Sequence, residues 1–166
     1  SSDKKNLEEV GQKEGISVHC IPMQRPISLC KDIIVSIQMA GLYIHVPFCA
    51  KRCLYCDFFS NTEMKYKEPY INALIKEMEL RKGYIGNEAL ETIYFGGGTP
   101  SQLDEKDFGK IFEAIYRHFD VAEQMEITLE ANPDDMKREY VSLLRNYPFN
   151  RVSMGVQSFH PEDLRF

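Results

Sequence analysis

The chain has 166 residues, a formal net charge of −5, 43% apolar residues and 27% charged residues. This length suits one domain with a buried core, and the composition is that of a globular protein in water. The negative charge argues against a nucleic-acid partner held by phosphate contacts, and no apolar run approaches the length of a membrane span.

Residues 1–38 show no sustained periodicity. They are polar at first and then irregular, with Pro22 and Pro26 in the second half. We therefore expect an irregular extension that is not part of the domain that follows. Its two cysteines, Cys20 and Cys30, are interpreted as incidental.

From residue 39 to residue 166, strand-like and helix-like segments alternate. Apolar runs predict strands at residues 42–46, 91–95, 125–129 and 151–156. Apolar residues at helical spacing predict helices over residues 69–82, 103–119 and 136–147. Asp104 is the expected cap of the second helix, and Asp134 or Asp135 that of the third. Such alternation predicts an α/β fold with a parallel sheet, whose ligands lie at the carboxyl ends of the strands.

Three cysteines follow the first predicted strand with the spacing C-x3-C-x2-C: Cys49, Cys53 and Cys56. Three thiolates on one loop can hold a 4Fe–4S cluster and leave its fourth iron open to a cofactor or substrate. Lys51 and Arg52 separate the first two cysteines, which argues against a buried apolar strand. The spacing indicates an iron–sulfur site. Because iron-binding thiols need a reducing compartment, we expect a cytoplasmic protein.

A zinc site is the strongest alternative reading of these cysteines, because thiolates also bind Zn²⁺. Structural zinc sites usually have four ligands in paired C-x2-C units, and the chain has one such unit. His45 would then have to be the fourth ligand, although it lies on the predicted strand before the loop. Disulfides fit poorly with an odd count of five cysteines.

A glycine-rich run, Gly96-Gly97-Gly98-Thr99-Pro100, directly follows the second predicted strand. Glycines let the backbone approach a ligand closely, and N–H groups exposed there can bind a carboxylate. The alternative is a tight strand-to-helix turn, which a glycine triplet by itself would favour.

Polar residues also follow the third and fourth predicted strands. Glu130 comes after residues 125–129, where a carboxylate can accept hydrogen bonds from a ribose diol or an amino group. Its other reading is an exposed loop acid that caps the next helix. Gln157 comes after residues 151–156 and, taken alone, is more typical of a solvated strand end.

The four motifs occur in an order that resembles the radical S-adenosylmethionine (SAM) enzymes. The run Y-I-H-V-P-F-C-x3-C-x2-C-D-F, residues 43–58, is similar to the oxygen-independent coproporphyrinogen III oxidase family and its HemW-like heme chaperone branch. The oxidase branch typically carries another cysteine two positions after the third cluster cysteine. Here that position is Phe58, which favours the HemW-like branch.

The resemblance implies a partial radical SAM β/α barrel with about four parallel strands, a 4Fe–4S cluster on the three cysteines, and bound SAM. It implies SAM contacts at Tyr43, Tyr55, Gly97, Gly98, Thr99, Glu130 and Gln157. It also implies that the cluster, reduced by a donor such as flavodoxin or ferredoxin, cleaves SAM to a 5′-deoxyadenosyl radical.

Residues 39–166 are similar to the N-terminal part of that core domain, so we expect a truncated domain that is inactive alone. Three functions compete. The first is a HemW-type heme chaperone that passes heme to a heme-accepting protein. The second is a coproporphyrinogen III oxidase that acts on a porphyrinogen in porphyrin biosynthesis. The third is a non-catalytic metal-binding fragment.

Overall fold

The computed structural model describes residues 18–26, 36–53, 56–57, 59–160 and 162, with the backbone alone for residues 18–26 and 36–38. The described strands are β1 (Val18–Pro26), β2 (Ser36–Val46), β3 (Leu90–Gly97), β4 (Val121–Ala131) and β5 (Arg151–Met154). The described α-helices are α2 (Lys67–Arg81), α3 (Glu105–His118) and α4 (Arg138–Leu144). Short 3-10 helices are η1 (Met64–Tyr66), η2 (Pro100–Gln102) and η3 (Pro133–Asp135).

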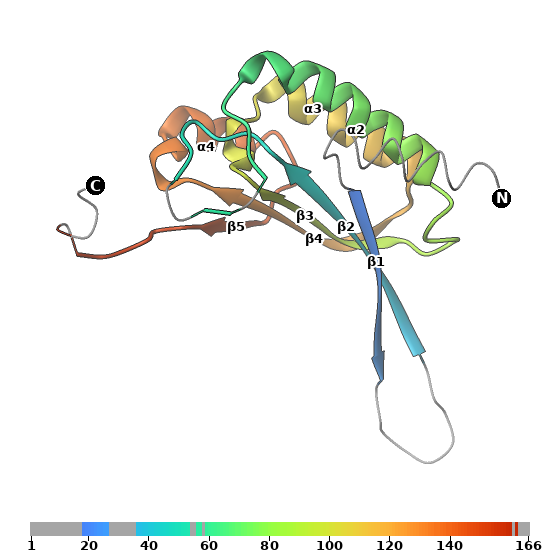
Figure 1. Ribbon diagram of the computed structural model, residues 1–166. Coiled ribbons are helices and arrows are strands. Elements are labelled where there is room, and N and C mark those ends of the chain that lie inside the picture. The colour runs from blue at the N-terminus through green and yellow to red at the C-terminus, as the bar shows by residue number, and fades with distance from the viewer. Residues whose placement is uncertain (1–17, 27–35, 54–55, 58, 161, 163–166) are drawn as a thin grey trace.

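The strands form one sheet in the order β1-β2-β3-β4-β5. Strands β2 to β5 are parallel to their neighbours, and helices follow three of them in the chain. The predicted α/β fold with four parallel strands is therefore confirmed. Figure 1 shows the helices gathered on one face of this sheet, whereas the other face carries no helix among the described residues.

The core lies between that face and the helices. Alternate residues of β2, β3 and β4 point toward the helices and are buried, because successive side chains of a strand point to opposite faces. Phe95 on β3 is fully buried, and its ring lies 6.0 Å from Phe108, 5.6 Å from Phe112 and 5.3 Å from Phe149. Burial of such aromatic rings supplies much of the stability of a small domain.

Helix α3 begins as the sequence predicts. The Asp104 side chain accepts a hydrogen bond from the Asp107 backbone N–H, and the Asp107 side chain accepts one from the Asp104 backbone N–H, which forms a capping box. Lys67 in the first turn of α2 lies 2.6 Å from both carboxylates. This ion pair holds the beginnings of the two helices together on the covered face.

The predicted cap of the third helix is wrong. Helix α4 begins at Arg138, and its N-cap residue Lys137 makes no side-chain capping bond. Asp134 instead lies in η3, where its backbone N–H donates to the Asn132 side chain. The Asp135 carboxylate accepts hydrogen bonds from side chains of η2, so a tertiary contact outweighs its tendency to cap a helix.

The predicted irregular structure is also wrong for the described part of residues 1–38. Strand β1 pairs with β2 antiparallel, from Val18 opposite Ile44 to Pro26 opposite Ser36. Pairing satisfies the backbone N–H and C=O groups of the β2 edge, which side-chain periodicity does not reveal. In Figure 1 this pair extends away from the helix-covered body. That residues 1–38 lie outside the family domain stays a prediction.

Among the described residues, no helix has the length and apolar character needed to cross a bilayer.

Candidate cofactor site

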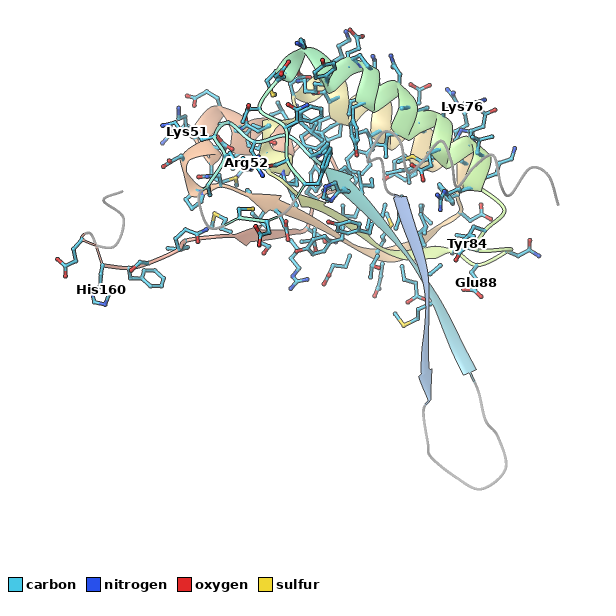
Figure 2. All side chains as sticks on the ribbon, viewed as in Figure 1. Lys51, Arg52, Lys76, Tyr84, Glu88 and His160 are labelled. Atoms are coloured by element: carbon cyan, nitrogen blue, oxygen red, sulfur yellow. The ribbon has the colours of Figure 1, made fainter. Side chains whose placement is uncertain are left out.

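Most of the predicted site residues that the structure describes lie at one end of the sheet, where the parallel strands reach their carboxyl ends. Figure 2 shows Lys51 and Arg52, from the cysteine loop, near one end of the sheet, and Tyr84 and Glu88 near the other. Because β2, β3 and β4 run in the same direction, the segments that follow them converge at the first of these ends.

The glycine-rich run lies directly against the start of the cysteine loop. The Gly98 N–H donates to the Val46 carbonyl at 2.7 Å, and the Thr99 N–H donates to the Phe48 carbonyl at 2.7 Å. The Thr99 hydroxyl donates to Cys49 Sγ at 3.3 Å. Three hydrogen bonds therefore join the glycine-rich run to the end of β2 and the start of the cysteine loop. Thr99 and Cys49 are 50 residues apart in the chain.

Close packing explains why this run needs glycines. Gly97 has a φ of +109°, which other residues rarely adopt, and a Cβ there would lie 2.6 Å from His45 Nδ1. A Cβ on Gly98 would lie 2.9 Å from the carbonyl oxygens of Val46 and Phe48 and 3.0 Å from Cys49 Sγ. The glycines were expected to let the backbone approach a ligand closely. Here they also let the end of β3 pack closely against the end of β2.

The three cysteines are free thiols on one anchored loop. Cys49 and Cys56 are half-buried and Cys53 is exposed. The Cys49 N–H donates to the Asn61 carbonyl at 3.1 Å, which holds the two ends of the loop together, and the Cys56 N–H donates to the Cys53 carbonyl at 3.2 Å. Three soft thiolate ligands fit an iron–sulfur cluster in their chemistry. Within the described ranges, no three His, Cys, Asp or Glu side chains are already gathered in a metal-binding arrangement.

Glu130 lies on the open face of the sheet, held by two donors from β3. The Tyr94 hydroxyl donates to Glu130 Oε1 at 2.6 Å, and the Gly97 N–H donates to Oε2 at 3.3 Å. Tyr43 on β2 stacks on Tyr94, with ring centroids 6.0 Å apart and planes inclined by 23°. The structure therefore brings three predicted site residues, Tyr43, Gly97 and Glu130, into one cluster.

Burial, the hydrogen bond to Glu130 and the charge of that carboxylate all raise the pKa of the Tyr94 phenol. Tyr94 therefore stays protonated at neutral pH and acts as the donor in this bond. His45, on the same face, shares a hydrogen bond of 3.3 Å between its Nδ1 and the Tyr43 hydroxyl.

Sequence reasoning missed Ser101, which joins the loops that follow β3 and β4. Ser101 is buried, and its hydroxyl donates to Asp135 Oδ2 at 2.6 Å and accepts from the Asn132 N–H at 3.2 Å. Gln102 Nε2 also donates to Asp135 Oδ2, at 2.8 Å. Turn residues such as these signalled loops in the sequence, but nothing in their spacing signalled that the two loops bond to each other.

One predicted SAM contact that the structure describes, Gln157, is not brought to this cluster. Gln157 is exposed and has a φ of +67°, and its Nε2 donates to the carbonyl of Gly155 at 3.2 Å. Its role as a nucleotide contact stays a prediction. Tyr55 lies outside the described residues.

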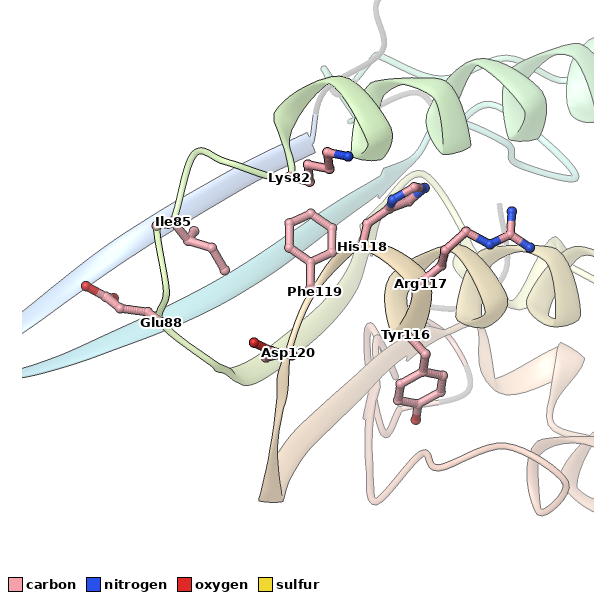
Figure 3. A pocket seen from close by; sticks show the side chains of 9 residues that line it. Lys82, Ile85, Glu88, Tyr116, Arg117, His118, Phe119 and Asp120 are labelled. Atoms are coloured by element: carbon pink, nitrogen blue, oxygen red, sulfur yellow. The ribbon is translucent and has the colours of Figure 1, made fainter.

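A cavity of about 160 Å³ lies at the opposite end of the sheet, beside the ends of α2 and α3 (Figure 3). Lys82, Arg117 and His118 line it together with Glu88 and Asp120. Cationic side chains at helix C-termini interact favourably with the helix dipoles, which accounts for the basic residues here without a ligand. The cavity is separate from the cysteine loop.

The family is settled by a sequence comparison. A model of the Radical SAM superfamily matches residues 43–166, which include the cysteine loop, the glycine-rich run and Glu130. The chain belongs to the radical SAM superfamily. This membership implies a 4Fe–4S cluster and SAM as cofactors.

Named relatives place the chain more closely within the radical SAM superfamily. It is 39% identical over 128 residues to the heme chaperone HemW of Bacillus subtilis (strain 168), covering 75% of this chain and 33% of that protein. It is 35% identical over 127 residues to HemW of Buchnera aphidicola subsp. Acyrthosiphon pisum (strain APS), covering 75% and 34%. It is 34% identical over 134 residues to HemW of Escherichia coli (strain K12), covering 79% and 35%.

A solved structure has the same fold. The coproporphyrinogen III oxidase HemN of Escherichia coli, a radical SAM enzyme, superposes with a TM-score of 0.68 and 31% sequence identity, over 74% of this chain and 29% of that one. The chain thus matches part of the HemN radical SAM barrel. It spans about a third of the length of the curated relatives that it matches.

Proposed function

We propose that this chain carries the cluster- and SAM-binding part of a HemW-type heme chaperone. The observation that carries the proposal is the set of relatives named heme chaperone HemW, at 34% to 39% identity. Phe58 supports it, because the oxidase branch typically has a cysteine at that position.

In this proposal, Cys49, Cys53 and Cys56 are the cluster ligands. Thr99 donates a hydrogen bond to Cys49 Sγ, and such a bond stabilises a thiolate in its ligating form. A bound cluster supplies the electron for reductive cleavage of SAM, and its open iron offers a position for the methionyl group. The protein's own contribution is to orient the thiols.

The SAM contacts that we propose are Tyr43, Tyr55, Gly97, Gly98, Thr99, Glu130 and Gln157. Glu130 supplies acceptor oxygens for hydroxyl or ammonium donors of SAM. The tyrosine rings supply flat apolar surface for the adenine. The glycine-rich run leaves room for the methionyl end at the carboxyl edge of β3.

The second candidate is an oxygen-independent coproporphyrinogen III oxidase, which the similarity to HemN favours. Heme is the proposed ligand in the first case and a porphyrinogen in the second. A heme-accepting protein, an electron donor such as flavodoxin or ferredoxin, and a cytoplasmic setting follow from the first.

The deciding experiment for the cofactor site is electron paramagnetic resonance on the anaerobically reconstituted and reduced chain, with and without SAM. We expect a 4Fe–4S signal that changes when SAM is added. A signal that ignores SAM would contradict the SAM site. Tight zinc binding without any cluster would support the non-catalytic metal-binding fragment.

Cys53→Ala should abolish cluster assembly, because two thiolates cannot hold a cluster that needs three. The measurement is iron and sulfide content after reconstitution. Cys20→Ala is the matched control, since Cys20 lies outside the C-x3-C-x2-C run, and it should retain the cluster. Full cluster occupancy in Cys53→Ala would contradict the ligand assignment.

The choice between the two functions needs the full-length protein. Heme titration followed by absorbance, together with a coproporphyrinogen turnover assay, separates them. We expect heme binding without turnover. Turnover of coproporphyrinogen would instead establish the oxidase.

A further inference from the structure

Tyr94 and Glu130, two residues on neighbouring strands of the open face, share a hydrogen bond. At 2.6 Å from the Tyr94 hydroxyl to Glu130 Oε1, the bond is short, as expected when a neutral donor meets a carboxylate. Both side chains are half-buried, so water competes less for the bond than it would on a fully exposed surface.

The two carboxylate oxygens of Glu130 are fixed by different donors. Tyr94 bonds Oε1, whereas the Gly97 N–H bonds Oε2 at 3.3 Å. A carboxylate has about four acceptor sites on its two oxygens, so these bonds orient the group and leave it further acceptor capacity. The bond from Tyr94 is the shorter of the two. Because its donor is a side chain and not the backbone, a substitution can remove it.

The Tyr94 ring is also fixed. It stacks on Tyr43 at 6.0 Å, and a Cβ on Gly96 would lie 2.8 Å from Tyr94 Cε1, so glycine at this position makes room for the ring. A side chain held by close packing on one side and by a hydrogen bond at its tip has lost most of its rotamer freedom. It can therefore hold its partner in one orientation without a further entropic cost when a ligand binds.

We propose that Tyr94 is a positioning residue for SAM, which acts through Glu130. Its hydroxyl holds the carboxylate in the orientation that accepts hydrogen bonds from SAM, and does not itself contact the cofactor. The inference rests on the proposed SAM site and adds a residue to it. Neither the glycine-rich run nor the cysteine spacing indicates this residue.

The test is a double-mutant cycle on the dissociation constant of SAM, measured by anaerobic equilibrium dialysis with the reconstituted chain. Tyr94→Phe removes the hydroxyl and keeps the ring that stacks on Tyr43. We expect it to weaken SAM binding about tenfold, the size of one charge-assisted hydrogen bond. In a Glu130→Ala background, Tyr94→Phe should change the dissociation constant less than about twofold, because the acceptor that Tyr94 positions is gone.

Tyr84→Phe is the matched control. Tyr84 is 65% exposed and lies toward the opposite end of the sheet (Figure 2), so the same loss of a hydroxyl should leave SAM binding unchanged. A second readout is the change that SAM causes in the resonance of the reduced cluster. It should persist in Tyr94→Phe at saturating SAM, because the cofactor still reaches the iron.

The outcomes separate the inference from the proposed function. If wild-type protein holds a cluster and binds SAM, and Tyr94→Phe weakens binding equally in the wild-type and the Glu130→Ala backgrounds, Tyr94 acts independently and the inference is overturned. An unchanged dissociation constant in Tyr94→Phe overturns it too. If reconstituted wild-type protein does not bind SAM, the proposed SAM site fails, and the positioning role fails with it.

Discussion

The two faces of the sheet are built from the same strands but have different roles. On the helix-covered face, Ile93, Phe95 and Leu129 are fully buried in the core. On the open face, Tyr94 and Glu130 are half-buried and bond to each other. Because side chains alternate along a strand, each strand can contribute apolar packing on one face and polar groups on the other. Changes on the covered face should therefore affect folding, and changes on the open face should affect binding.

The sharpest test of the covered face is Phe95→Ala. We expect it to lower the free energy of unfolding by about 3–5 kcal/mol, because it leaves a cavity among the rings of Phe108, Phe112 and Phe149. Urea denaturation followed by circular dichroism measures the loss. Phe159→Ala is the control, since Phe159 is 90% exposed and should cost less than about 0.5 kcal/mol. Equal losses in the two variants would contradict the assignment of the core.

Gly97→Ala tests whether the turn at the end of β3 requires a glycine. The φ of +109° and the distance of 2.6 Å from the added Cβ to His45 Nδ1 should cost about 1–3 kcal/mol of stability. Gly83→Ala is matched, because a Cβ there meets nothing within 4 Å, and it should be neutral or slightly stabilising. Thermal unfolding compares them. A Gly97→Ala variant as stable as Gly83→Ala would show that the turn tolerates a side chain.

Ser101→Ala should lower the free energy of unfolding by about 1–2 kcal/mol, because it leaves the Asn132 N–H without its acceptor and removes one donor from Asp135. Ser142→Ala, at an exposed position of α4, supplies the same chemical change without such contacts. The two should differ clearly in urea denaturation. Identical midpoints would mean that the loops after β3 and β4 do not depend on this hydroxyl.

The smallest effect is expected for Thr128→Val. Thr128 is 1% exposed although it lies on the open face, and its hydroxyl donates to Glu126 Oε1 at 3.3 Å. Valine keeps the shape, so the loss should be under about 1 kcal/mol. Thr92→Val, exposed on the same face, is the comparison and should be neutral. A loss above about 2 kcal/mol would show that this hydroxyl is part of the core.

Element types were more predictable than element ends. All four parallel strands and all three helices predicted after residue 39 are present, because the period of the apolar residues reports which face is buried. The strand predicted at residues 125–129 extends over Val121–Ala131, since backbone pairing with β3 does not require an apolar side chain. The helix predicted at residues 136–147 is shorter, Arg138–Leu144, and it begins two residues late because Asp135 is bonded to Ser101 in the preceding turn.

The local chemistry of this protein could be predicted from neighbouring residues in the chain. The spacing of three cysteines on one loop, and three glycines directly after a strand, can be read without a fold, because thiolate ligand sets and backbone freedom depend on nearby residues. The pairing of β1 with β2, the bond from Ser101 to Asp135 and the bond from Tyr94 to Glu130 became visible only in the folded chain. Ser101 and Asp135 are 34 residues apart in the chain, and Tyr94 and Glu130 are 36 residues apart. Each pair meets because consecutive parallel strands end at the same edge of the sheet.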